Sequence, residues 1–149
     1  MNRIGIACAI AGSACAGIAS GQVVLDGSSS ITATGQNFAY LFDNLDPSIG
    51  DATIRVFGLG DYSIVPPSSE TMTWSIDGIA SDVGFNESAF EDPNNIDLFQ
   101  NAVDQTWTIS AADMAAITAD GSLNLTLTNS TAVNFFSDQP EDFLAFEIT

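Results

Sequence analysis

The chain has 149 residues, enough for one domain with a hydrophobic core and too few for two domains of ordinary size. Nineteen Asp and Glu residues stand against two Arg residues, with no Lys or His, and the net charge is -17. Nucleic acid and anionic membranes are poor partners for such a surface, and the absence of His excludes the usual Ser-His-Asp and Cys-His nucleophiles.

The first residues are typical of a secretory signal peptide. Arg3 precedes an apolar run that ends in small residues, and this run is too short for an ordinary membrane span. Cleavage after Ala19 and cleavage after Gly21 both fit the small residues that the peptidase requires. Because both cysteines lie in this leader, residues 1–21, the mature chain 22–149 is expected to be a single secreted domain without cysteine.

The mature chain begins with short strand patterns. Residues 22–25 and 30–34 are predicted as two strands, broken by Asp26-Gly27 and the serines that follow. Residues 38–45 are apolar on both faces for five positions, which predicts a strand buried on both sides or a sheet edge under a loop.

The strongest alternation of apolar and polar side chains lies in residues 51–78. Residues 52–57 and 71–76 alternate with period two, as half-buried strands do, and an insert containing glycines and prolines separates them. This segment is predicted as the centre of a β-sheet. Arg55 falls on the outward face, where it is expected to pair with a carboxylate, and Trp74 falls on the inward face.

A stretch without a clear period follows at residues 86–105. It is predicted as a long surface loop whose two phenylalanines pack back onto the domain. Residues 105–109 resume the strand alternation with Trp107 inward. Trp74 and Trp107 are therefore predicted to be core residues rather than a sugar-stacking platform.

One helix is predicted at residues 110–121. Ser110 stands at the N-cap position, Asp113 has capping-box spacing, and Gly121 follows the end. The helix is about two turns long. Residues 123–128, 132–136 and 144–149 are predicted as the last strands. Many short strands with turns between them predict an all-β fold, a jelly-roll-like β-sandwich with one short helix.

Several weak motifs follow one another in a particular order along the chain. They are Gly60-Asp61 after a strand, Glu70 before the next strand, the Ile76-Asp77-Gly78 turn, the alanine-rich helix that closes in Asp120-Gly121, the strand at residues 123–128, and Val133-Asn134. With the leader, this order resembles the secreted β-sandwich domains of PEP-CTERM-type surface proteins of Gram-negative and planctomycete bacteria. The resemblance implies a cell-surface or matrix protein with jelly-roll relatives that bind glycans or calcium. The last residues carry no Pro-Glu-Pro motif, apolar span or basic tail, so release or assembly without that anchor is expected.

Calcium is the cofactor that the residues permit, because it binds carboxylate, amide and backbone oxygens in a loose shell. Three acidic loops are candidate sites, although none has EF-hand spacing and solvated acidic turns are the alternative. The candidate ligands are Asp43, Asp46 and Asp51 in the first loop, Asp61, Glu70 and Asp77 in the second, and Glu91, Asp92 and Asp97 in the third.

Aromatic residues in the loops are candidates for contact with a ligand. Tyr62, Phe90 and Phe99 are the residues of this kind, although aromatic side chains also anchor loops to a core.

The sequence leaves three functions open. The first is a non-catalytic secreted cell-surface or extracellular-matrix protein, a structural or self-assembling subunit whose open sheet edges pair with other copies. The alternatives are a calcium-assisted carbohydrate-binding module and a small glycoside hydrolase that uses two carboxylates. The sequence does not indicate which two carboxylates a glycoside hydrolase would use.

Overall fold

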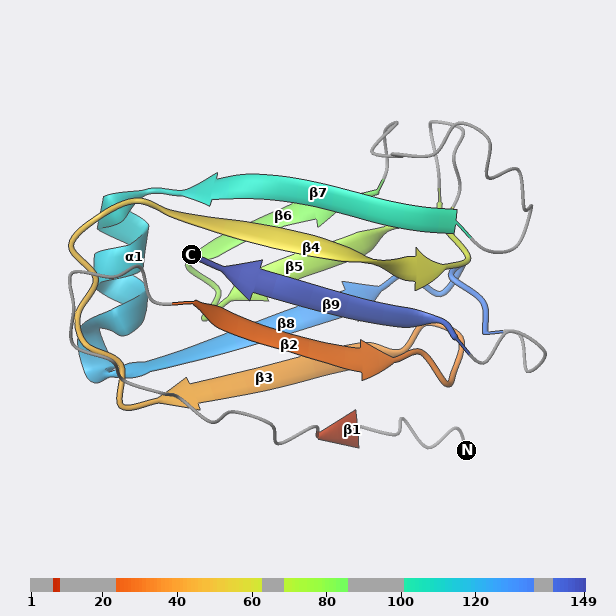
Figure 1. Ribbon diagram of the computed structural model, residues 1–149, viewed down its shortest axis with the longest axis horizontal. Coiled ribbons are helices and arrows are strands. Elements are labelled where there is room, and N and C mark those ends of the chain that lie inside the picture. The colour runs from red at the N-terminus through yellow and green to blue at the C-terminus, as the bar shows by residue number, and fades with distance from the viewer. Residues whose placement is uncertain (1–6, 9–23, 63–68, 86–100, 136–140) are drawn as a thin grey trace.

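The computed structural model describes residues 7–8, 24–62, 69–85, 101–135 and 141–149. They form an all-β sandwich with one short helix, as the sequence predicts (Figure 1). The strands are β1 (Ala7–Cys8), β2 (Leu25–Ser30), β3 (Asn37–Asp43), β4 (Ala52–Gly60), β5 (Met72–Ile76), β6 (Ala80–Gly84), β7 (Asn101–Ile109), β8 (Ser122–Asn129) and β9 (Phe143–Ile148).

The pairings from β2 to β9 nest like those of one long hairpin. The β5–β6 pair lies innermost, and the pairs β4–β7, β3–β8 and β2–β9 follow outward, all antiparallel. The hairpin is rolled up, because β9 also pairs with β4 and β8 also pairs with β5. The result is two facing sheets: sheet B has the order β2-β9-β4-β7, and sheet A has the order β3-β8-β5-β6. This arrangement of eight strands is a jelly roll.

The two strands predicted at the centre of a sheet are interior strands, but of different sheets. β4 lies between β9 and β7, whereas β5 lies between β8 and β6. Their inward residues, such as Ile54 and Val56 on β4 and Ile76 on β5, are fully buried. The connection between them therefore crosses from one sheet to the other, and the core lies between the facing sheets.

The first strand is continuous where the sequence predicted a break. β2 includes Asp26 and Gly27 and pairs with β9 over all six of its residues. A Cβ at position 27 would come within 2.7 Å of the Phe146 ring. The prediction was wrong because this glycine provides room for an aromatic ring instead of ending the strand.

The burial of one other strand and the extent of two others also differ from prediction. β3 is exposed on one face, since 63% of Leu41 is accessible. β7 begins at Asn101, because its first residues pair with the end of β4 at Gly60. Residues 132–135 form no strand, since Val133 closes a turn and its carbonyl accepts the N–H of Gly35.

β1 adds to the outer edge of β3 in parallel orientation. This two-residue strand lies inside the predicted leader. The edge of sheet A at β3 thus accepts a further strand by backbone pairing.

Helix α1 (Ala111–Ile117) and a 3₁₀ turn, η1 (Thr118–Asp120), cover one end of the sandwich (Figure 1). The predicted cap is confirmed: the backbone N–H of Asp113 donates to Ser110 Oγ at 3.2 Å. Met114 and Ile117 point into the core. Within the residues that the structure describes, no helix is both long and apolar enough to span a membrane.

Gly58 lies where the central strands of sheet B approach each other, and a Cβ there would be 2.2 Å from the carbonyl oxygen of Phe143 on β9. Gly58→Ala is expected to lower the free energy of unfolding by about 1–3 kcal/mol, because the two backbones must separate. Urea denaturation measures the change.

Gly50→Ala is the matched control, since a Cβ there meets no atom within 4 Å. It is expected to change stability by less than about 0.5 kcal/mol. Equal unfolding midpoints for the two variants would contradict the close contact between β4 and β9.

Candidate functional site

The first group of predicted calcium ligands lies at the end of the sandwich that carries α1. Asp43, Asp46 and Asp51 are exposed. Asp51 Oδ1 accepts the backbone N–H of Ala111 at 2.8 Å, at the first residue of α1. A carboxylate at a helix start satisfies a free N–H and interacts favourably with the helix dipole. Asp51 therefore has a structural role in this fold.

The second group does not form one site. Asp61 and Glu70 lie beside each other, whereas Asp77 follows the opposite end of β5, about 20 Å of extended chain away from Glu70. Asp61 is buried and accepts both the backbone N–H and the Nδ2–H of Asn134, at 3.0 and 2.8 Å. Burial, and then the charge of Asp61, raise the pKa of the Glu70 carboxyl. The predicted grouping with Asp77 was wrong because a whole strand separates the residues.

The third group lies outside the described residues, and so do two of the predicted ligand contacts. These residues are Glu91, Asp92, Asp97, Phe90 and Phe99. In the part of the chain that the structure describes, no three His, Cys, Asp or Glu side chains are grouped to hold a metal. Calcium binding stays a prediction.

Tyr62, the remaining predicted ligand contact, is fully buried, so that prediction was wrong. Its hydroxyl donates to Asn129 Oδ1 at 2.9 Å, and its ring meets the Phe85 ring edge-on at a centroid distance of 5.0 Å. Its carbonyl accepts the Nδ2–H of Asn101 at 2.8 Å. Tyr62 therefore connects the segment after β4 with β8, with β7 and with Phe85 just after β6.

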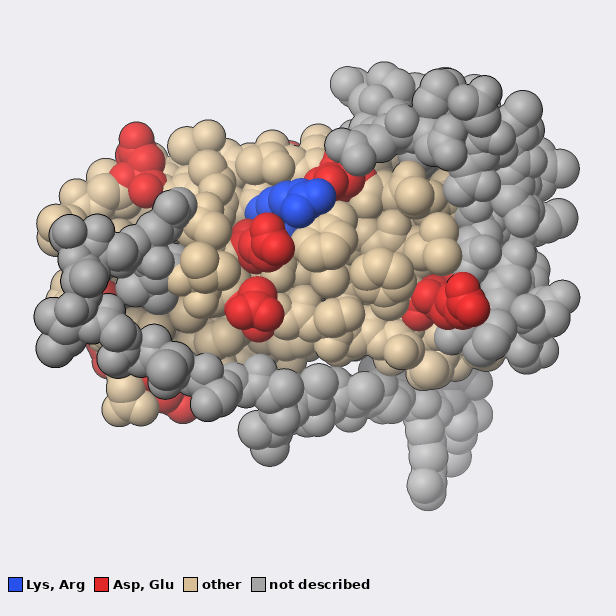
Figure 2. All heavy atoms as spheres, in the orientation of Figure 1, with Lys and Arg blue, Asp and Glu red and all other residues tan. Residues whose placement is uncertain are grey.

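The outer face of sheet B carries charge at its centre (Figure 2). Arg55 Nε donates to Asp104 Oδ1 at 2.8 Å, and its Nη1 lies 3.6 Å from Glu147. The guanidinium also lies 4.6 Å from the centroid of the Phe57 ring. The hydrogen bond to Asp104 is the main reason that the pKa of Arg55 is raised. The predicted outward position and carboxylate partner of Arg55 are confirmed.

The outer face of sheet A differs, because its centre is uncharged. Two rows of outward side chains cross all four strands of the jelly roll in this sheet, one residue from each strand. Most of them carry hydroxyl or amide groups. The rows are Asn37, Thr128, Thr73 and Val83, and Ala39, Thr126, Ser75 and Ser81.

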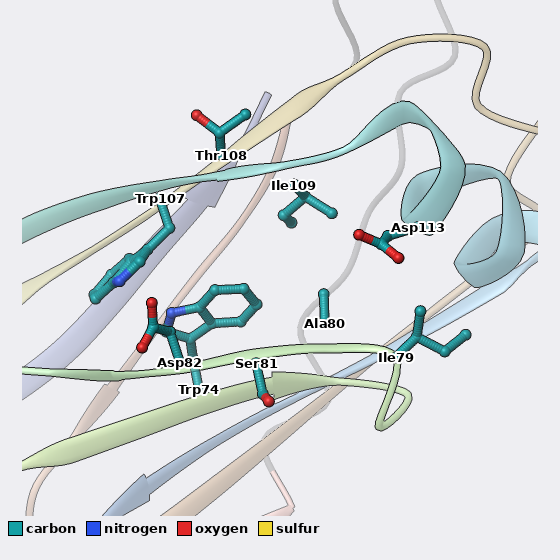
Figure 3. Close-up of a pocket in the computed structure, with 9 residues that line it drawn as sticks. All are labelled: Trp74, Ile79, Ala80, Ser81, Asp82, Trp107, Thr108, Ile109 and Asp113. Atoms are coloured by element: carbon teal, nitrogen blue, oxygen red, sulfur yellow. The ribbon is translucent and has the colours of Figure 1, made fainter.

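A cavity of about 330 Å³ lies where the edge strand β6 of one sheet faces the edge strand β7 of the other, beside α1 (Figure 3). It combines indole rings, small apolar side chains and carboxylates. Its lining includes Trp74, Ala80, Asp82, Trp107, Ile109 and Asp113.

Both tryptophans of the chain line this cavity. Their ring centroids are 5.7 Å apart and their planes are inclined by 58°. Trp74 is 3% exposed, and its Nε1–H has no hydrogen-bond partner among the described residues. An unsatisfied buried donor costs about 1–3 kcal/mol. Gly84 makes room for Trp107, since a Cβ at 84 would lie 2.8 Å from Trp107 Cη2.

The inward direction of both tryptophans was predicted, but their shared cavity was not. The signal that could have revealed it is Asp82, which pairs directly with Trp74 across β5 and β6. Residues opposite each other in a sheet share a face. An Asp on the inward face of a strand therefore indicates that the two sheets are open at this position.

The topology defines the class of the protein as an antiparallel jelly-roll β-sandwich. No protein-family model matches the chain, and no curated protein matches it. The structure is similar to part of a family GH115 4-O-methyl-α-glucuronidase, BtGH115A, with specificity for decorated arabinogalactans, at 14% identity and a TM-score of 0.40. That similarity covers 82% of this chain and only 14% of the glucuronidase.

A second similar structure is the P-domain of Macrobrachium rosenbergii nodavirus, at 14% identity and a TM-score of 0.31. The similarity covers 84% of this chain and 89% of that one. At these identities and TM-scores, the two similarities carry no argument about function.

The pKa values of Tyr62 and Tyr40, the two tyrosines of the chain, are both raised, mainly by burial. In the unfolded chain both hydroxyls lose their protons near pH 10, whereas in the folded protein they keep them. Stability is therefore expected to be unaffected by these groups below pH 10 and to fall as the pH rises above it. Tyrosinate absorbance, followed with circular dichroism, measures both changes.

Tyr62→Phe is expected to cost about 1–3 kcal/mol at neutral pH, because Asn129 Oδ1 loses its donor in a buried position. Tyr40→Phe is the matched control and is expected to cost less, since its partner Ser29 is only half-buried. Titration of both tyrosines near pH 10 in the folded protein would contradict the buried positions.

Proposed function

We propose that this protein is a non-catalytic, secreted structural subunit that associates with further copies through the outer face of sheet A. The observation that carries the proposal is the pair of uncharged rows on that face, in a chain with a net charge of -17.

Electrostatics favours this face over the outer face of sheet B. Two copies of a strongly acidic protein repel each other, and surface charges act over a Debye length of about 8 Å at physiological salt. The outer face of sheet B presents Asp26, Asp104 and Glu147 against Arg55 alone. The two rows of sheet A carry no charge, and the exposed Asp43 lies at the end of β3, away from them. Contact through these rows therefore brings fewer like charges together than contact through sheet B.

The face also offers apolar and hydroxyl groups for contact. Leu41 is 63% exposed and Val83 is 42% exposed, and both point outward from this sheet. Four strands at about 4.8 Å spacing, with about six residues each, form a flat area of roughly 400 Å². A standard interface takes about 800 Å² from each partner. Association through this face alone is therefore weak and depends on concentration or on repetition along an assembly.

The composition supports the non-catalytic part of the proposal, and the predicted leader supports secretion. A chain without His, whose two cysteines both lie in the predicted leader, has no nucleophile and base of the common kind. Cleavage of that leader would also remove β1 and leave β3 as the edge of sheet A. A free edge of this kind is a second place where copies can pair.

Light scattering after size exclusion tests the proposal on the chain without residues 1–21. The mean mass is expected to increase with protein concentration and with added salt, because salt screens the repulsion. Runs with calcium and with chelator at equal ionic strength show whether the cation contributes beyond screening. A monomer at every concentration and salt level would refute self-association.

Thr128→Glu places a charge in one of the two rows and is expected to reduce the mass at high salt towards that of a monomer. Thr106→Glu is the matched control, since Thr106 is an exposed threonine on the outer face of sheet B. If both variants associate like the wild type, the contact does not lie on the outer face of sheet A.

A further inference from the structure

The cavity between β6 and β7 follows from the topology of the roll. β6 and β7 are the terminal strands of their sheets, so the inner faces of the sandwich are least covered along this side. Ala80, Asp82 and Gly84 alternate on the inward face of β6. Ala80 is too small to fill the space, whereas Trp107 occupies the room beside Gly84. A volume of about 330 Å³ is at the lower end of the range for small-molecule sites.

The polar groups of the cavity require a particular kind of ligand. Trp74 Nε1–H is buried and has no partner among the described residues, and the close-up shows the indole nitrogen directed towards the space beside Asp82 and Trp107 (Figure 3). This donor requires an acceptor.

The carboxylates of Asp82 and Asp113 are acceptors only. Asp82 Oδ1 already accepts the backbone N–H of Val83 at 2.7 Å. Asp113 Oδ2 accepts the hydroxyl of Ser110 at 2.7 Å. Each carboxylate has a second oxygen that can accept from a donor on a ligand.

A hydroxyl group satisfies both requirements, because it accepts one hydrogen bond and donates another. An anion would accept from Trp74 but would be repelled by Asp82, Asp113 and the net charge of -17. An organic cation would suit the carboxylates and the indole faces but would leave Trp74 Nε1–H without an acceptor.

We infer that this cavity is a binding site for a neutral polyhydroxylated ring, the size of one monosaccharide unit. One hydroxyl accepts from Trp74 Nε1–H, a hydroxyl donates to Asp82, and the apolar face of the ring packs against Trp107. The cavity shares only Ser81 with the two rows on the outer face of sheet A, and the inference does not require the protein to associate with itself.

The fluorescence of the two tryptophans tests the inference, because both line the cavity and the chain has no others. The probes are D-glucose, D-galactose, N-acetyl-D-glucosamine and tetramethylammonium chloride, each titrated into the full chain. At least one of the three sugars is expected to change the emission with saturation in the millimolar range, as for a ligand of about a dozen heavy atoms. Tetramethylammonium is expected to have no saturable effect.

Two variants locate the binding. Trp74→Phe keeps an aromatic ring and removes the donor, and it is expected to weaken sugar binding about tenfold. Asp82→Ala is expected to have an effect of similar size and to fold normally, since Asp82 is exposed on an edge strand. Asp26→Ala, an exposed acid on the outer face of sheet B, is the matched control and is expected to bind like the wild type.

Three results would overturn the inference. One is the absence of saturable binding by all three sugars, which would make the cavity a hydration site only. Another is saturable binding of tetramethylammonium alone, which would make it a cation site. The third is wild-type sugar affinity in both Trp74→Phe and Asp82→Ala, which would place the ligand elsewhere.

Discussion

The fold depends on the pairing of β9 with β4. These strands come from distant parts of the chain, and β9 lies between β2 and β4 as the second strand of sheet B. Without this pairing and that of β8 with β5, the nested hairpin would remain an open ribbon with both faces in water. With both pairings, the apolar residues of the two sheets face each other and form one core. Gly58 permits the approach, because any larger residue would contact the backbone of β9.

The roll gives the protein two outer faces with different chemistry and one side where the sheets are open. Sheet B presents carboxylates around Arg55, whereas two rows across sheet A are uncharged. The open side lies along β6 and β7, and both tryptophans line the cavity there, Trp74 from β5 and Trp107 from β7. These three regions result from the order of the strands and from the alternation of inward and outward side chains along each strand. None of them depends on the conformation of a loop.

Much of the fold could be predicted because the alternation of apolar and polar residues along a strand shows directly which side chains are buried. Strands such as β8, with Leu123, Leu125 and Leu127 inward, show the pattern without interruption, and the cap of α1 depends only on neighbours in the sequence. The errors have a common physical cause. Gly27 was predicted as a turn residue because the sequence does not show that the Phe146 ring packs against it. The first residues of β7 were predicted as a loop because the sequence does not show that they pair with β4. Tyr62 was wrongly predicted to contact a ligand because the residues that bury it and accept its hydrogen bond, such as Asn129, lie far away in the sequence.

The nested pairing also governs when the chain can complete its fold during synthesis. Leu25, which follows the predicted leader closely, pairs with Ile148, the last residue of β9, and among the strands of the described residues β9 alone pairs with β2. Loop-closure entropy makes this outermost pair the most costly to form from an unfolded chain. The N-terminal strand therefore stays without a partner until the last residues have emerged. A chain with this topology therefore remains incompletely folded until residues 143–148 have left the ribosome.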